Sequence, residues 1–126
     1  MVAFSSVAVQ GLLAFNLICT GQTTFKGEVH PFLNVIRVDL KSGRFCEQDC
    51  KLIKPLARVI STELVFEDRD ADGVFWNMRY IRETGTYFSE VRMQVGSSEI
   101  ARWDAGSCKR GAFTGFPATA KVKGQD

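Results

Sequence analysis

Four cysteines have the chemistry that is easiest to assign from spacing. Cys46 and Cys50 enclose the short loop Glu47-Gln48-Asp49, whereas Cys19 and Cys108 lie near opposite ends of the chain. Four cysteines allow three disulfide connectivities. We favour Cys46 with Cys50 and Cys19 with Cys108, because the first pair is local and the second would tie the first strand to the last and close a long loop.

Two alternatives for the cysteines remain open. Four buried thiols in a reducing cytosol are one, because free cysteine is among the most buried residue types. A zinc thiolate site is the other, and it is less favoured because the paired Cys-x-x-Cys spacing is missing and His30 is the only histidine. If both disulfides form, we expect a periplasmic or secreted protein.

An acidic stretch offers candidate metal ligands. Asp68, Asp70 and Asp72 precede Gly73 with the Asp-x-Asp-x-Asp-Gly spacing that opens an EF-hand calcium loop. The twelfth loop position, where that motif has a bidentate glutamate, is Arg79, and the flanking segments are typical of strands rather than helices. A polar hairpin tip is the favoured interpretation, and a calcium-stabilised β domain is the alternative.

A third group could bind a ligand. Strand periodicity places Trp76 and Tyr80 on one face of a hairpin, and the next strand brings Arg102 to the same face. An inward arginine needs a carboxylate, an aromatic ring or a ligand. Structural stacking of Arg102, or a register one residue off, is the favoured interpretation. A barrel interior that holds a small apolar or anionic ligand near Trp76, Tyr80 and Arg102 is the functional alternative.

No catalytic constellation stands out. The chain has no Gly-x-Ser-x-Gly, no phosphate-binding glycine-rich loop and no pair of histidines. His30, before Pro31, lies in a segment of loop composition with no nucleophile or orienting carboxylate beside it in the sequence. We therefore expect no enzymatic activity and no cofactor.

The ligand candidates depend on one hairpin, 75–95. With Thr84-Gly85 as a two-residue turn, one face carries the pairs Arg82 with Tyr87, Tyr80 with Ser89, Met78 with Val91 and Trp76 with Met93. This mostly apolar face should be core. The other face carries Ile81 with Phe88, Arg79 with Glu90, Asn77 with Arg92 and Phe75 with Gln94, and it should be largely solvated. Phe75, Phe88 and Trp103, if exposed beside Arg79 and Arg92, would favour a protein partner or a homo-oligomer, unless they pack against the N-terminal segment.

The remaining pattern is also that of strands and tight turns. Residues 14–25 predict a first strand, with Phe15, Leu17 and Cys19 on one face and Gly21 marking a bulge or bend. Residues 32–41 alternate and turn at Ser42-Gly43, which pairs Leu40 with Phe45. The other expected features are strand rather than helix over 52–60, alternation of Thr62, Leu64 and Phe66 with Glu63, Val65 and Glu67, and a turn at Gly96-Ser97 that puts Val91 opposite Arg102.

The sum of these segments is seven or eight short strands, which predicts an all-β fold. Successive tight turns favour a small antiparallel up-and-down barrel, and a two-sheet sandwich is the runner-up. We expect a single domain over residues 1–126, with a core over about 14–117 and loose termini, including the tail from Ala118.

Composition narrows the class of partner. The 126 residues carry 16 basic and 14 acidic side chains, interleaved along the chain, so no basic block indicates nucleic-acid binding. The apolar run 1–18 has no Lys or Arg before it and is interrupted by polar residues, so it predicts neither a signal peptide nor a membrane span. The chain is then a mature or trimmed form, or its start is not the native one.

Several short motifs carry a resemblance. They are Asn16-Leu17-Ile18-Cys19-Thr20-Gly21, Arg37-Val38-Asp39-Leu40 with Arg44-Phe45-Cys46, Gly106-Ser107-Cys108 and Phe113-Thr114-Gly115-Phe116-Pro117. Over 15–117 the chain resembles a group of small uncharacterised exported bacterial all-β proteins, which implies export and no known activity. Its plan, a small β-barrel with cysteines near both ends, is similar to that of bacterial inhibitors of c-type lysozyme, although none of their inhibitory residues can be placed here.

These observations predict a non-catalytic binding module for an unknown small ligand or protein partner. A protein-interaction or inhibitor domain that acts outside the cytoplasm is the alternative.

Overall fold

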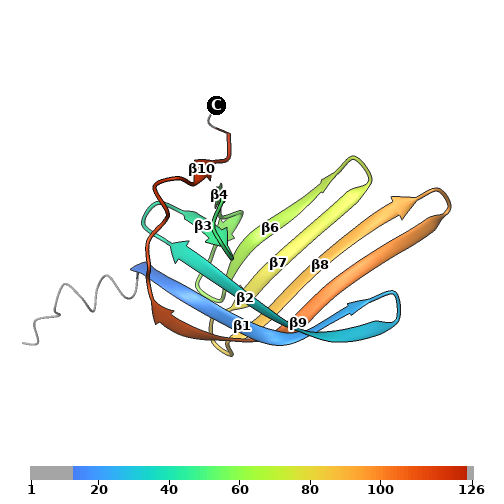
Figure 1. The fold of residues 1–126 in the computed structure, drawn as a ribbon, viewed down its shortest axis with the longest axis horizontal. Helices are drawn as coiled ribbons and strands as arrows, with labels where there is room; N and C mark the ends of the chain where they lie inside the picture. Colours follow the sequence, from blue (N-terminus) through green and yellow to red (C-terminus); the bar gives the residue numbers. More distant parts are fainter. Residues whose placement is uncertain (1–12, 125–126) are drawn as a thin grey trace, which may run out of the picture.

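The protein is a single ten-stranded sheet curled into a half-barrel, seen in a computed structural model that describes residues 13–124 (Figure 1). Most of the apolar run 1–18 lies outside the described residues. The strands are β1 (Ala14–Phe25), β2 (Glu28–Asp39), β3 (Arg44–Glu47), β4 (Leu52–Pro55), β5 (Arg58–Val59), β6 (Glu63–Ala71), β7 (Val74–Ile81), β8 (Thr86–Val95), β9 (Ser98–Ala112) and β10 (Lys121–Val122). The predicted all-β class is confirmed.

The strand order is β10-β4-β3-β2-β1-β9-β8-β7-β6-β5. Two meanders, β1 to β4 and β5 to β9, are joined where β1 pairs with β9, and all neighbours are antiparallel except β10 and β4. The predicted closed up-and-down barrel is therefore wrong. β4 and β5 follow each other in the chain but stand at opposite ends of the sheet order, and no ladder joins them within residues 13–124.

The core occupies one end of the concave face. Its fully enclosed side chains include Phe15, Leu17, Ile36, Val38 and Leu64. Phe45 of β3 and Phe66 of β6 meet across the curl with ring centroids 5.0 Å apart. This aromatic contact joins the two halves of the half-barrel where backbone hydrogen bonds do not.

A pair of glycines lets the sheet bend. Gly21 of β1 lies opposite Gly106 of β9, and a Cβ at Gly21 would stand 2.1 Å from the carbonyl oxygen of Ala105. Phe32 and Tyr87 lie opposite the same glycines on the outer neighbouring strands, and their rings contact each other at 5.8 Å. Gly21 thus marks no bulge in either ladder. It permits close backbone approach under two aromatic rings.

The β7–β8 hairpin keeps its predicted faces but not its predicted register. Tyr80 pairs with Tyr87, Met78 with Ser89 and Trp76 with Val91, because the loop has four residues, 82–85, rather than two. Gly85 closes this loop with a φ of 74° and donates its N–H to Ile81. A shift of two residues preserves the period-2 faces, so Met78, Tyr80 and Tyr87 are buried as expected. The turn before β3 is likewise longer than predicted, and Phe45 pairs with Val38.

The β8–β9 hairpin has the predicted register. Val95 pairs with Ser98 and Val91 with Arg102, so the Gly96-Ser97 turn is confirmed. Residues 52–60 form β4 and β5, which confirms the strand prediction there.

A β-bulge in β6 changes which side chains face inward. The register shifts between Val65, opposite Arg79, and Glu67, opposite Met78. Leu64, Val65 and Phe66 are consequently all buried, so the predicted alternation holds for Leu64 and Phe66 and is wrong at Val65 and Glu67. The extra residue moves Glu67 from the convex to the concave face, which is a common use of bulges.

The C-terminal segment differs from the loose tail expected. It crosses the convex side, where Arg37 donates a hydrogen bond to the Gly115 carbonyl at 2.9 Å and Asn16 bonds Thr114 at 3.0 Å. It then adds β10 beside β4 and packs Phe116, Ala120 and Val122 on the pair Cys46 and Cys50.

Both predicted disulfides are present. Cys19 bonds Cys108 across the β1–β9 ladder, and Cys46 bonds Cys50 within the short loop after β3. No cysteine is free. Two disulfides indicate an oxidising, extracytoplasmic environment.

Candidate functional site

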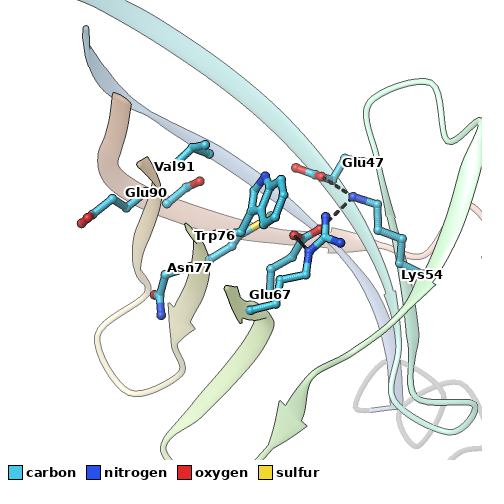
Figure 2. Close-up of a pocket in the computed structure, with 10 residues that line it drawn as sticks. Glu47, Lys54, Glu67, Trp76, Asn77, Glu90 and Val91 are labelled. Atoms are coloured by element: carbon cyan, nitrogen blue, oxygen red, sulfur yellow. Dashed lines mark hydrogen bonds and ion pairs between the residues drawn. The ribbon is translucent and has the colours of Figure 1, made fainter. Parts of the chain in front are cut away.

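The concave face beyond the core holds two adjoining hollows. The first, of about 280 Å³, is lined by Glu47, Lys54, Glu67, Arg69, Trp76 and Ser89 among others (Figure 2). The second, of about 260 Å³, is lined by residues that include Asn34, Glu47, Tyr87, Ser89, Arg102 and Asp104. Because Glu47 and Ser89 belong to both, we treat the two as one feature and call it the concave groove.

A chain of charges crosses the first hollow. Lys54 Nζ lies 2.8 Å from Glu67 Oε1 and 3.9 Å from Glu47 Oε2. Glu67 Oε2 in turn lies 3.5 Å from Arg69 Nε. The side chain of Glu67 is only 12% exposed and that of Lys54 25%, so water screens these charges less than at an open surface. The chain links β4 to β6 across the gap that no backbone ladder closes.

The aromatic side of this hollow is Trp76. The guanidinium of Arg69 stacks over the indole at 3.9 Å from the ring. Arg69 is thereby held by an ion pair on one side and a ring on the other. The β6 bulge is the reason, since it turns both Glu67 and Arg69 toward the concave face.

The second hollow is built on hydrogen bonds. Asn34 Nδ2 donates to Glu47 Oε1 at 2.8 Å and to the Tyr87 hydroxyl at 3.3 Å. Since a carboxylate only accepts, this contact fixes the orientation of the amide. Burial raises the pKa of Tyr87 well above its usual value, so the hydroxyl keeps its proton. On the far side Asp104 accepts from Thr23 and lies 3.9 Å from Arg102 Nε.

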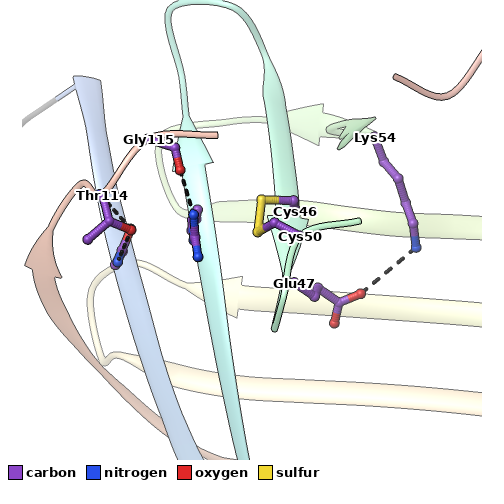
Figure 3. Close-up of a disulfide and its surroundings, with 8 residues drawn as sticks. Cys46, Glu47, Cys50, Lys54, Thr114 and Gly115 are labelled. Carbon is purple, nitrogen blue, oxygen red and sulfur yellow. Dashed lines mark hydrogen bonds and ion pairs between the residues drawn. A yellow bond between two sulfur atoms is a disulfide. The ribbon is translucent and has the colours of Figure 1, made fainter. Parts of the chain in front are cut away.

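The Cys46–Cys50 disulfide positions Glu47. Cys46 is covered by the C-terminal segment on the convex side. Because successive side chains of a strand point to opposite faces, Glu47 projects to the concave side, and Figure 3 shows it directed at Lys54. The loop is further tied to β2, because the Gln48 N–H donates to the Val35 carbonyl at 2.8 Å. A covalent loop thus supplies one of the groove carboxylates.

Of the three predicted ligand residues, two line the concave groove and one belongs to the core. Trp76 lines the first hollow and Arg102 the second, in the same cross-strand row as Val91. Arg102 is not inward in the sense expected, since its side chain is 58% exposed in the open half-barrel. Tyr80 is 4% exposed and belongs to the core, where it pairs with Tyr87.

Sequence reasoning missed the residues that define the groove. Simple alternation puts Glu67 on the strand face opposite Leu64 and Phe66. Lys54 falls in a segment broken by Pro55, and Glu47 falls in a predicted polar loop. The apolar run Leu64-Val65-Phe66 is the one signal that could have found Glu67, because three consecutive apolar residues within an otherwise alternating strand are consistent with a bulge.

The acidic tip forms a two-residue turn rather than a loop of ligands. Asp72 and Gly73 both have positive φ, while Asp68 and Asp70 lie within β6. Asp68 pairs with Arg58 at 3.1 Å. Across residues 13–124 no three His, Cys, Asp or Glu side chains gather in a way that could hold a metal ion.

His30 lies in β2 rather than in a loop. Its Nε2 is 3.2 Å from a carboxylate oxygen of Glu28, a neighbour that sequence reasoning did not credit as a partner. Both side chains are well exposed at the start of the strand.

The residues predicted for the solvated face lie on the convex face: Phe75, Phe88 and Trp103 with Arg79 and Arg92. Arg92 pairs with Glu90 at 2.6 Å and stacks over Phe75 at 4.5 Å, in place of the predicted pair of Arg79 with Glu90. Arg79 instead contacts Glu63 at 3.1 Å. Phe75 and Phe88 are half-buried. Trp103 is 41% exposed, in one row with Val29, which is 53% exposed.

Comparison of the chain with protein-family models, with curated proteins and with solved structures gives no match. The likeness noted from the sequence motifs therefore stays a prediction. In the part of the chain that the structure describes, no helix has the length and apolarity needed to cross a membrane.

Proposed function

We propose that the protein is a non-catalytic binding module of the periplasm or the secreted space, whose ligand lies in the concave groove. The proposal keeps Trp76 and Arg102 as ligand contacts and adds Glu47, Lys54 and Asn34. Tyr80 acts as a core residue under this proposal.

The observation that carries the proposal is the partly buried charge chain in an open groove. Holding Glu67 and Lys54 away from water costs free energy that an apolar pair of similar volume would not cost. The core end of the same face is filled with apolar side chains, which shows that these strands can pack an apolar interior. Charged side chains at the other end are consistent with recognition of something polar.

An apolar ligand fits this groove less well. Sites for apolar ligands are mostly lined by hydrophobic and aromatic side chains, with a few polar groups. Here carboxylates, an ammonium group, two guanidinium groups and several amides line the two hollows, and the aromatic side chains among them are Trp76, Phe32 and Tyr87. A polar ligand is therefore favoured over the apolar one considered from the sequence.

The two tryptophans of the chain provide a test with an internal control. Trp76 lies in the groove and Trp103 on the convex face, so each face has one indole N–H signal in a ¹H–¹⁵N spectrum. A library of small polar, charged and apolar compounds should give ligands that move the Trp76 signal and leave Trp103 in place. Compounds that move only Trp103 would contradict the proposal.

The convex face supports a second candidate, a protein interface. Trp103 of β9 and Val29 and Leu33 of β2 are exposed apolar side chains on this face, and Arg92 of β8 lies over Phe75 of β7. Aromatic and arginine side chains are enriched at interfaces. Self-association would move the Trp103 signal with protein concentration or give a sedimentation mass above that of one chain. A mass of 14.0 kDa at every concentration, with a constant Trp103 signal, would exclude a homo-oligomer.

A further inference from the structure

The groove carries no unmatched charge. Every charged side chain that faces the two hollows lies in an ion pair: Glu47 and Glu67 with Lys54, Glu67 also with Arg69, and Arg102 with Asp104. A site that selects a charged ligand keeps a charge of opposite sign for it. The matched charges here favour a ligand that is polar but neutral.

The polar groups also alternate between donors and acceptors. Glu47 and Asp104 accept, Lys54 and Arg102 donate, and Ser89 can do both. Their ion pairs and hydrogen bonds hold them in place before a ligand arrives, which lowers the entropic cost of binding. Hydroxyl groups, each a donor and an acceptor, match such a lining better than a carboxylate or an ammonium ligand does.

One buried acceptor lacks a donor. Asn34 is 9% exposed and lines the second hollow, and its Oδ1 has no hydrogen-bond partner among residues 13–124. Both of its amide hydrogens are directed at Glu47 and Tyr87, so the oxygen cannot be satisfied by rotating the amide. A buried acceptor without a partner costs free energy. The oxygen is enclosed, so a ligand hydroxyl could recover that cost only after a neighbouring side chain of the hollow has moved.

Each hollow also has an aromatic wall. Trp76 forms it in the first hollow, and Phe32 with Tyr87 forms it in the second. A sugar ring has a C–H face that packs on an aromatic ring while its hydroxyls point sideways to polar groups. Two aromatic walls in adjoining hollows, with Glu47 and Ser89 between them, suit successive rings of one chain.

A peptide is the competing neutral ligand, and the position of the groove disfavours it. Peptides that bind sheets usually add a strand to a free edge, where main-chain groups are available. The floor of the groove, which carries Trp76, Ser89 and Arg102, lies on β7, β8 and β9, whose main-chain groups are used in ladders on both sides. The strand edges that no ladder covers among residues 13–124, β2 before Ile36 and β6 after Val65, border this floor. What the face offers is side chains.

We infer that the ligand of the concave groove is a neutral oligosaccharide, bound by stacking on the face of Trp76 opposite Arg69 and by hydroxyl hydrogen bonds to Glu47 and Ser89. This inference rests on the proposed function and narrows its ligand class.

The test is titration of the folded, disulfide-bonded protein with cellotetraose, chitotetraose and maltotetraose, followed by ¹H–¹⁵N spectra. At least one of them should shift the Trp76 indole signal at concentrations up to about 10 mM, which would detect even a weak complex, and should leave Trp103 unmoved. Tetragalacturonate and a capped neutral tetrapeptide serve as charged and peptide comparisons. If no neutral saccharide shifts Trp76, the inference is wrong.

Variants separate stacking from general damage. Trp76→Ala should weaken the saccharide complex at least about tenfold, whereas Trp103→Ala, which removes an indole on the other face, should change it less than about twofold. Trp76→Phe keeps a ring and should retain most of the affinity, which guards against loss of folding in the alanine variant. Equal effects of Trp76→Ala and Trp103→Ala would overturn the inference.

The two proposals fail differently. If the tetrapeptide or tetragalacturonate binds at Trp76 and no neutral saccharide does, the saccharide inference is wrong and the groove is still the binding site. Ligands that shift only the Trp103 signal would contradict the proposal that the groove is the binding site.

Discussion

The two ends of the concave face are built from the same strands and do different things. Along β1, Phe15, Leu17 and Cys19 are fully enclosed, whereas Phe25 on the same face is 38% exposed. Along β2, Ile36 and Val38 are enclosed and Glu28 is exposed. One end is an apolar core and the other is an open polar groove.

Coverage explains the difference. β3 pairs with β2 only over Ile36–Asp39, and β5 pairs with β6 only at Leu64 and Val65. The short strands therefore cover one end of the curl, while the long hairpins β6–β7 and β8–β9 extend beyond them (Figure 1). Where a strand face is covered, apolar side chains are stabilised by burial. Where it is open, the same alternation carries groups that interact with water or a ligand.

Removing disulfides should distinguish the two ends most strongly. Cys19 and Cys108 are 89 residues apart, so replacing both with alanine should lower the free energy of unfolding by about 4 to 5 kcal/mol, against about 2 kcal/mol for Cys46 and Cys50, which are 4 apart. Urea unfolding of the two double variants measures both values. The Cys46–Cys50 variant should also move groove signals near Glu47. Equal losses of stability would contradict the loop-closure argument.

Substituting a glycine at the bend comes next. Gly21→Ala places a Cβ against the backbone of β9, which no side-chain rotation can relieve, so we expect a loss of about 3 kcal/mol. Gly111→Ala is the matched control on the same ladder, because its Cβ would only reach ordinary contact at 3.4 Å from Ile18 Cδ1. Thermal unfolding of both compares them. A Gly21→Ala variant as stable as Gly111→Ala would show that the close approach does not matter.

Substitutions in the chain of charges should lower the free energy of unfolding less than the glycine substitution does. Lys54→Met leaves Glu67 and Glu47 without their shared partner and should cost about 1 to 2 kcal/mol. Adding Glu67→Leu removes the stranded carboxylate, so the double variant should recover part of the loss. A denaturant double-mutant cycle gives the coupling. If the two losses simply add, Lys54 and Glu67 are not coupled.

Tyr87 gives the smallest effect, and it depends on pH. Its pKa is raised in the folded state by burial, so above about pH 10 the unfolded chain loses this proton while the folded chain keeps it, and stability falls as pH rises. Tyr87→Phe should cost about 1 kcal/mol near neutral pH through the lost Asn34 contact, and it should lessen the fall above pH 10. Unfolding curves at pH 8 to 11 compare the two proteins. Identical slopes would count against Tyr87 as the titrating group.

Much of the fold could be predicted because it depends on local pattern. Alternation assigned the buried face of β1 and both faces of the β7–β8 hairpin, and those faces survive even a register error of two residues, since side-chain direction repeats every second residue. Spacing alone predicted both disulfides.

The groove could not be predicted in the same way. A single extra residue in β6 reversed the facing of Glu67 and Arg69, and whether a bulge is tolerated depends on what Phe66 packs against, here Phe45 of a distant strand. Whether the sheet closes into a barrel could not be predicted either, because closure depends on how far β4 and β5 extend and on the bend at Gly21 and Gly106. The sequence by itself determined the strand class, the faces and the disulfides. The tertiary structure decided the open half-barrel and the meeting of Glu47, Lys54 and Glu67, since these depend on contacts between residues that no local period relates.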